Sequence, residues 1–306
     1  MKSRRRFTPM RARALAKVTL SLHVLGARPD GFHEIDALTV AATAPYDEIR
    51  LAPLGRPTSV VVTPKGAAPS VAAQNLAARA IEALRPHLPD DLVGVRIRLH
   101  KQIPVGAGLG GGSSDAAAVL ARVGRHFGVA PRTLERIAAR LGSDVPFMIR
   151  GVPARMCGRG EILVAAPETP ELHVVIAAPP FGCSTPAVYR AWDELGGPEA
   201  SRRVDSRVLA RQLRNDLEPA ALVVAPELAE FRDAFATCTG CDPILLGSGS
   251  SWAIMADDES HAATLAARAR SHLGLASVWA ARTLTVRRAR RVASATVIKR
   301  SSSEPV

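Results

Sequence analysis

The chain has 306 residues, of which 47% are hydrophobic and 22% charged, and this length and composition suit a folded protein of two domains. It has no apolar run of about 18 residues, which argues against a membrane helix, and its four cysteines are too few for a disulfide scaffold. Of the net charge of +12, residues 1–17 carry +7 and residues 281–306 carry +6, which leaves −1 for the folded body and disfavours a specific nucleic-acid partner.

The basic ends could bind nucleic acid non-specifically, but we interpret them as solvated tails and residues 289–306 as a flexible one. A twin-arginine export signal is disfavoured, since no apolar segment follows the arginines at the start. Cys238 and Cys241 have metal or redox spacing, yet zinc would need a second pair of ligands, so loop thiols are the better interpretation. We therefore expect a cytoplasmic protein with no membrane partner.

Alternating polarity predicts the first strand, at residues 16–25, with apolar Val18, Leu20, Leu22 and Val24 on one face. We expect this strand to be half-buried. Apolar positions spaced by four in residues 75–88 predict an amphipathic helix, and residues 92–99 alternate again as a strand. The other elements expected in this region are strands over 37–44, 48–51 and 59–62, helices over 113–123 and 131–141, and a helix start at 143–146.

Short strands and helices are also expected in the second part of the chain, which predicts an α+β protein. The expected boundaries are an N-terminal domain over 1–155 and a C-terminal domain over 156–288. The expected elements are strands over 173–177, 244–246 and 280–286 and helices over 185–194, 206–212 and 260–269.

A glycine-rich segment, residues 104–117 (PVGAGLGGGSSDAA), lies between a predicted strand and a predicted helix. Glycines let successive N–H groups approach a ligand, and a helix start near 113–115 favours an anion. A flexible linker is the alternative, but a linker would not separate two patterned elements. The segment is neither a P-loop nor a Rossmann fingerprint. It predicts a site for a polyphosphate.

The glycine-rich segment resembles the central motif of the GHMP kinases. Residues 16–20 (AKVTL), 28–34 (RPDGFHE) and 141–147 (LGSDVPF) resemble signatures of one of their families, the 4-diphosphocytidyl-2-C-methyl-D-erythritol kinases, and residues 246–251 (LGSGSS) resemble a third, glycine-rich motif. The likeness spans about residues 14–287, in the order found in the family.

The resemblance implies a two-domain GHMP kinase fold, with an N-terminal domain like ribosomal protein S5, a ferredoxin-like C-terminal domain and the active site between them. It implies transfer of the γ-phosphate of ATP, with Mg²⁺, to the 2-hydroxyl of 4-diphosphocytidyl-2-C-methyl-D-erythritol in non-mevalonate isoprenoid synthesis. The alternative within this superfamily is a kinase for another small alcohol. We expect a small-molecule substrate and a monomer or weak homodimer; no metal ligands are assigned.

The resemblance makes Lys17 and Asp144 the catalytic pair. A carboxylate can accept the hydroxyl proton, and a cation can stabilise the transferring phosphoryl group. From the residues alone, Asp144 would be a helix N-cap and Lys17 part of a solvated strand face. A paralogue that has lost catalysis is disfavoured because both residues are present.

The resemblance also assigns the binding residues. Phe32 and Tyr189 would stack on the cytosine, and His33 would contact the base edge. The chain departs from the usual family pattern at three positions. Thr19 stands in place of asparagine, Phe32 in place of tyrosine, and Ser250 in place of proline or alanine. Taken alone, Asn75 and Lys101 would be a helix cap and a surface lysine. The expected substrate residues are Phe32, His33, Thr185, Tyr189 and Thr19, and the expected ATP residues are Pro104, Val105, Gly106, Ala107, Gly108, Leu109, Gly110, Gly111, Gly112, Ser113, Ser114, Asn75 and Lys101.

Overall fold

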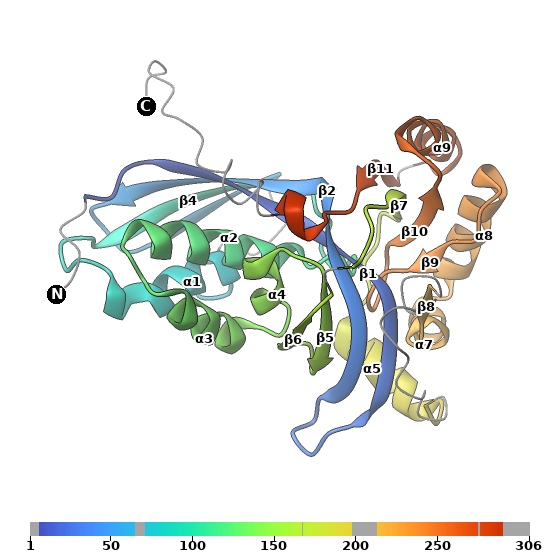
Figure 1. Ribbon diagram of the computed structural model, residues 1–306, viewed down its shortest axis with the longest axis horizontal. Coiled ribbons are helices and arrows are strands. Elements are labelled where there is room, and N and C mark those ends of the chain that lie inside the picture. The colour runs from blue at the N-terminus through green and yellow to red at the C-terminus, as the bar shows by residue number, and fades with distance from the viewer. Residues whose placement is uncertain (1–5, 65–70, 167, 198–212, 275, 290–306) are drawn as a thin grey trace.

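Two β-sheets form the framework of the computed structural model, which describes residues 6–64, 71–166, 168–197, 213–274 and 276–289 (Figure 1). The first sheet has the strand order β3-β4-β2-β1-β8, with β5 and β6 extending from β2, and the second has the order β11-β7-β10-β9. The strands of the first sheet are β1 (Met10–Ala27), β2 (His33–Leu54), β3 (Ser59–Thr63), β4 (Gly94–His100), β5 (Ala154–Gly158), β6 (Ile162–Ala165) and β8 (Arg214–Asn215). Those of the second are β7 (His173–Ala178), β9 (Ile244–Leu245), β10 (Trp252–Ala256) and β11 (Ser277–Arg282). The second sheet has the ferredoxin-like strand order that was predicted.

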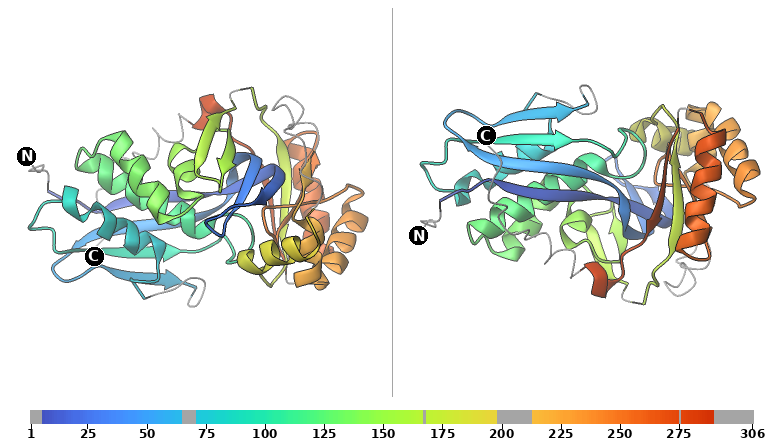
Figure 2. Two further views of the ribbon diagram at one scale, coloured as in Figure 1. Left: turned by 90° about the horizontal axis from the view of Figure 1, so that it is seen from below. Right: turned by 90° about the horizontal axis from the view of Figure 1, so that it is seen from above.

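The helices form two groups, one against each sheet (Figures 1 and 2). Asn75 caps the first helix by accepting a hydrogen bond from the Ala77 N–H, and a proline in the first turn of α3, α4 and α5 suits positions that need no backbone donor. The group on the first sheet is α1 (Leu76–Leu84), α2 (Gly111–His126), α3 (Pro131–Leu141) and α4 (Val145–Arg150), with a 3₁₀ turn, η1, at Arg85–His87. The other group is α5 (Thr185–Glu194), α7 (Glu218–Val224), α8 (Glu227–Thr239) and α9 (Glu259–His272).

Residues 16–24 of β1 are buried on both faces, so the prediction of a half-buried strand was wrong. Val18 and Leu20 pack with Val174 of the second sheet in one hydrophobic cluster. The polar face is buried too, with Lys17 9% and His23 5% exposed. Polar and apolar residues alternate along this strand because one buried face is polar and the other apolar, and not because one face is exposed to water.

The hairpin of β1 and β2 is longer than predicted, because the expected strands at 37–44 and 48–51 are parts of one 22-residue strand. Its pairing shifts register between Leu15 and Lys17, where the partner on β2 changes from Tyr46 to Ala41. The extra residues at this shift therefore lie on β2, and Lys17 begins the next stretch of pairing on β1.

Most other predicted elements are confirmed within a few residues, and α3 and α5 match their predicted ranges. The helix predicted over 75–88 ends earlier, at Leu84, and the last strand is β11, not residues 280–286. The helix predicted over 206–212 lies outside the described residues, as does the tail from residue 290. Among the described helices, none is long and apolar enough to cross a membrane.

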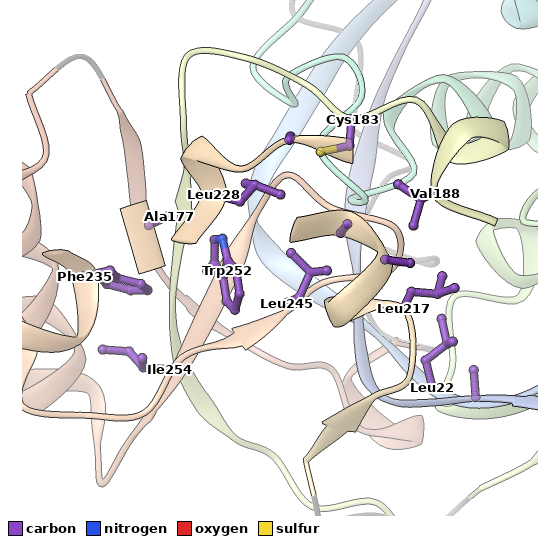
Figure 3. Packing of buried hydrophobic residues seen from close by; sticks show 14 of the residues in the cluster. Leu22, Ala177, Cys183, Val188, Leu217, Leu228, Phe235, Leu245, Trp252 and Ile254 are labelled. Atoms are coloured by element: carbon purple, nitrogen blue, oxygen red, sulfur yellow. The ribbon is translucent and has the colours of Figure 1, made fainter. Parts of the chain in front are cut away.

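The largest hydrophobic cluster joins the two parts of the chain. Leu22 of β1 lies in the same cluster as Val188 of α5, Leu217 and Trp252 (Figure 3). The predicted boundary at residue 155 falls inside β5, which pairs with β2 and β6 in the first sheet. We therefore propose that the domain boundary lies between β6 and β7, with β8 returning to the edge of the first sheet.

Candidate active site

A cavity of about 810 Å³ is lined by both parts of the chain. Its wall includes most of the glycine-rich segment, the Lys17 and Asp144 side chains, the turn at residues 31–33 and one side of α5. Gly247 and Ser248, from the third glycine-rich motif, complete it. The elements that were predicted to form a site are thus brought to one cavity.

The glycine-rich segment ends in α2, which begins at Gly111, earlier than the predicted start at 113–115. Gly110 precedes the helix with a φ of 69°, in the left-handed region that favours glycine. A Cβ atom there would lie 2.5 Å from the Met148 methyl group and 3.3 Å from the Lys17 side chain. Glycine at position 110 therefore lets the Met148 and Lys17 side chains approach the start of α2, and a helix start can bind an anion.

The first glycines of the segment serve a different purpose. A Cβ atom at Gly108 would lie 1.9 Å from the Leu246 carbonyl oxygen. The Ser250 N–H donates to the Gly106 carbonyl oxygen at 3.0 Å, and the Ser251 N–H donates to that of Ala107 at 3.2 Å. These glycines let the phosphate segment pack on the third motif, so part of the glycine pattern reflects contact between loops.

Two residues of the glycine-rich segment that belong to the predicted ATP set point away from the cavity. The buried Leu109 accepts a hydrogen bond from the Lys17 N–H through its carbonyl oxygen, at 3.0 Å. The Ser114 hydroxyl donates to the Leu15 carbonyl oxygen at 2.7 Å. Neither residue is part of the cavity wall, whereas residues 104–108 and 110–113 are. The two residues support the loop from behind.

Lys17 and Asp144 lie together at the cavity wall, and we call them the Lys17–Asp144 pair. The Lys17 Nζ is 3.6 Å from the Asp144 Oδ2, and the side chains are 11% and 31% exposed. Lys17 Nζ also donates to the Thr19 Oγ1 at 3.4 Å, but Thr19 itself is buried behind the wall. The alternative of a solvated lysine was therefore wrong. Asp144 occupies the N-cap position of α4, yet its side chain makes no capping hydrogen bond.

Lys101 is buried between two carboxylates, and the alternative of a surface lysine was wrong. Its Nζ lies 2.6 Å from the Asp115 Oδ2 and also donates to the Asp47 Oδ2. The Asp47 Oδ1 accepts from the backbone N–H groups of Gln102 and Ile103 at 2.6 and 2.9 Å. We call Lys101, Asp47 and Asp115 the buried triad. It ties α2 to Asp47 within β2 and to the residue that follows β4, and Lys101 still reaches the cavity wall.

The buried triad holds one cation and two carboxylates, so one negative charge is in excess. Burial raises the pKa of Asp115 to about 7, although Lys101 partly opposes this. Burial also acts to lower the pKa of Lys101, but the two carboxylates outweigh it and leave that pKa above its ordinary value. Lys101 thus stays charged, and Asp115 is the group that can take up a proton near neutral pH.

Aromatic side chains gather at the turn that joins β1 and β2. The His33 ring stacks on the Tyr189 ring with centroids 4.7 Å apart, and the Arg159 guanidinium lies 4.8 Å from the Phe32 ring centroid. Burial, together with the Asp144 carboxylate, raises the pKa of the Tyr189 hydroxyl. Phe32, with 46% exposure, is free to contact a ligand.

Two further predicted residues have structural partners. The Thr185 hydroxyl lies 2.7 Å from that of Ser248 and joins α5 to the third motif at the cavity wall. Asn75 caps α1, accepting from the Ala77 N–H at 3.0 Å, and does not line the cavity. Its neighbour Leu76 does line the cavity, while the Asn75 side chain caps the helix.

Several cavity residues were not identified from the sequence. Arg159, Arg190 and Asp193 line the cavity, and Asp47 and Asp115 hold Lys101. Asp193 could have been found, because it follows Tyr189 by four residues on a predicted helix and must share its face. No sequence pattern pointed to Arg159 or Asp47, since only the folded sheets bring Arg159 to the cavity and Asp47 to Lys101.

The described residues contain no group of three or more histidine, cysteine or acidic side chains that could hold a metal ion. The cavity does present the Asp144 carboxylate and the Ser113 hydroxyl. Mg²⁺ prefers oxygen ligands and is usually bound through one or two protein groups together with substrate phosphates. This donor set fits a Mg²⁺ ion that enters with a nucleotide.

Residues 75–152 match the model of the GHMP kinases N terminal domain. The chain is 38% identical over 271 residues to a 4-diphosphocytidyl-2-C-methyl-D-erythritol kinase from Pelotomaculum thermopropionicum, covering 85% of this chain and 93% of that protein. It is 38% identical to the kinase of the same name from Cereibacter sphaeroides, covering 85% and 95%.

Among solved structures, the chain is similar to the crystal structure of a 4-(cytidine 5'-diphospho)-2C-methyl-D-erythritol kinase. The TM-score is 0.72 at 34% sequence identity, and the match covers 90% of this chain and 99% of that one. The similarity therefore includes both sheets and the cavity between them.

Proposed function

The chain belongs to the 4-diphosphocytidyl-2-C-methyl-D-erythritol kinase family of GHMP kinases, and from this premise we propose that it transfers the γ-phosphate of ATP to the 2-hydroxyl of 4-diphosphocytidyl-2-C-methyl-D-erythritol. The observation that carries the proposal is the Lys17–Asp144 pair, which borders the same cavity as the start of α2. A cation, a carboxylate and a helix N-terminus are the groups that phosphoryl transfer to an alcohol needs. The product belongs to the non-mevalonate isoprenoid pathway.

In the proposed reaction, the first N–H groups of α2 bind the phosphates of ATP, and the Lys17 ammonium lies against the transferring group. The hydroxyl oxygen forms a bond to the γ-phosphorus while the bond from that phosphorus to the β–γ bridging oxygen breaks. The hydroxyl proton passes to an oxygen of Asp144, and ADP leaves with the electron pair of the broken bond. Lys17 stabilises the charge that develops on the phosphoryl oxygens.

Mg²⁺ would be held by the triphosphate together with Ser113 and Asp144, and it would neutralise phosphate charge. Lys101 and Leu76, the neighbour of Asn75, line the part of the cavity that we assign to the adenine. The buried triad would keep Lys101 in place while ATP binds. Asp144 and Lys17 keep the same roles whether or not the ion also contacts the protein.

We assign the base end of the substrate to Phe32, His33 and Tyr189. The flat faces of Phe32 and Tyr189 suit stacking on a cytosine, and the imidazole can form a hydrogen bond at the base edge. In the free chain His33 covers one face of Tyr189, so stacking uses either the other face or a shift of the imidazole. Thr185 and Thr19 are assigned supporting roles. We further propose a cytoplasmic enzyme that is a monomer or weak homodimer.

A coupled ADP-release assay tests the proposal against another alcohol kinase. The diphosphocytidyl substrate, homoserine and mevalonate are compared at equal concentrations with the wild-type chain. We expect kcat/KM to be at least about a hundredfold higher for the diphosphocytidyl substrate, because the base contacts are absent from the other alcohols. Equal or greater activity on homoserine or mevalonate would refute the proposal.

A further inference from the structure

The helix α5 holds the His33 imidazole from three directions. The ring stacks on Tyr189 at 4.7 Å with 30° between the planes and meets Trp192 edge-on at 5.6 Å and 87°. Its Nε2 lies 2.8 Å from the Asp193 Oδ1. The His33 side chain is only 9% exposed. His33, the first residue of β2, is thus oriented by a helix that follows it by about 160 residues in the chain.

The residues on this side of α5 form one row along the cavity. Thr185, Tyr189 and Asp193 are spaced by four and all line it. The Asp193 side chain is 45% exposed, and a hydrogen bond at such a position adds little to the stability of the fold. Orientation of His33 is therefore the more specific consequence of this contact.

The contact decides which imidazole nitrogen carries a proton. An ionised carboxylate can only accept hydrogen bonds, so the Nε2 that faces Asp193 must be the donor. In a neutral imidazole the Nδ1 is then an acceptor. An Nδ1 acceptor can receive a hydrogen bond from the exocyclic amino group of cytosine. Uracil has a carbonyl oxygen at that position, which is also an acceptor, so the two lone pairs would repel each other.

We propose that Asp193 is a positioning residue that fixes the His33 tautomer, so that Nδ1 accepts a hydrogen bond from the amino group of the substrate base and cytosine is selected over uracil. The proposal rests on the proposed function, because it takes the base to be that of the diphosphocytidyl substrate. It adds a residue of α5, outside the motifs that carried the family resemblance, to the recognition of the base. Asp193 acts through His33 and does not contact the reacting atoms.

The test compares the diphosphocytidyl substrate with its diphosphouridyl analogue at about pH 8. For Asp193→Ala we expect KM for the diphosphocytidyl substrate to rise about three- to tenfold, with kcat within about twofold, and the preference for cytosine to fall by a similar factor. Asp193→Asn should retain most of the preference, because its amide oxygen can still accept from Nε2.

Glu194→Ala is the matched control, since Glu194 is the next residue of α5, exposed, and not part of the cavity wall. It should leave both KM values and their ratio unchanged. An unchanged cytosine preference in Asp193→Ala would overturn the proposal, as would a kcat loss with constant KM.

Calorimetry with cytidine diphosphate and uridine diphosphate separates this proposal from the proposed function. If wild-type enzyme does not phosphorylate the diphosphocytidyl substrate, the proposed function fails. The ratio of the two affinities in wild type and Asp193→Ala then decides the present proposal. A ratio that favours cytidine diphosphate and shrinks in the variant supports it, and a ratio that is the same in both chains overturns it.

Discussion

Two lysine–aspartate clusters lie at or beside the cavity, and they differ in how closely their charged atoms approach and how deeply they are buried. In the Lys17–Asp144 pair the charged atoms are 3.6 Å apart, and the carboxylate is 31% exposed. In the buried triad Lys101 lies 2.6 Å from Asp115, and no side chain is more than 4% exposed. The same two residue types therefore serve in an open pair and in a closed cluster.

This difference indicates that the buried triad has a structural role and the Lys17–Asp144 pair a chemical one. A buried ion cluster fixes the elements that carry it, and removing its cation leaves the carboxylates without compensating charge. A loose, partly exposed pair gives little stability, but its atoms can exchange partners when a substrate enters. We therefore expect changes to the buried triad to lower mainly the free energy of unfolding, and changes to the Lys17–Asp144 pair to lower mainly kcat.

The largest effect on stability is expected from Lys101→Met, which leaves two carboxylates buried without a cation. The free energy of unfolding should fall by about 3–5 kcal/mol. Urea denaturation followed by circular dichroism measures it, with Lys17→Met as the control that changes it by less than about 1 kcal/mol. Equal losses in the two variants would remove the distinction between the clusters.

The next largest effect is expected on turnover, from Lys17→Met. Methionine keeps the unbranched side chain but removes the charge that would stabilise the transferring phosphoryl group. We expect kcat to fall about 10²- to 10³-fold with an unfolding midpoint close to that of wild type. If kcat stayed within about threefold, Lys17 would not act on the transition state.

A smaller effect follows from the pKa of Asp115, which is raised from 3.8 to about 7. The folded state therefore favours the protonated carboxyl, so its contribution to stability is complete below about pH 4 and lost as pH rises through about 7. Relative to Asp115→Asn, the unfolding free energy of wild type should fall between about pH 4 and pH 8. Parallel pH curves for the two chains would contradict the assignment of the excess charge to Asp115.

The smallest effect is expected from Thr19→Val, which removes the hydroxyl that accepts from Lys17 Nζ at 3.4 Å. The hydrogen bond is long, so we expect kcat/KM to fall only about two- to fivefold. Steady-state kinetics measures it, and Thr39→Val, a buried threonine on the neighbouring strand whose Oγ1 has no hydrogen-bond partner in the structure, is a matched control. A loss as large as that of Lys17→Met would mean that Thr19 contacts the substrate itself.

Local sequence patterns predicted the fold well where residues within a helix or strand determine where it begins and ends. The proline start of α5 and the glycine end of α3 could be found from the sequence, and so could the order strand, glycine loop, helix. The burial of the Lys17 face of β1 could not, because the elements that cover it come from distant parts of the chain. The same holds for Lys101, whose partners Asp47 and Asp115 lie 54 and 14 residues away.

The candidate site was predicted mainly through resemblance to a family. Spacing alone favoured a helix cap for Asp144, and only the structure showed that its side chain does not cap α4. The glycine-rich segment was predicted as one phosphate loop, but its first glycines pack on the third motif and its last ones open the start of α2. No local pattern distinguishes a glycine that admits a ligand from one that admits another loop.

The central claim is that the open pair performs the phosphoryl transfer while the rest of the cavity binds. Its most direct test is the single-turnover rate of Asp144→Asn at saturating ATP and diphosphocytidyl substrate, with ATP affinity measured by calorimetry. We predict a rate lower by about 10²- to 10⁴-fold and a dissociation constant for ATP within about threefold of wild type. A rate close to that of wild type, or a loss of ATP binding as large as the loss of rate, would contradict the claim.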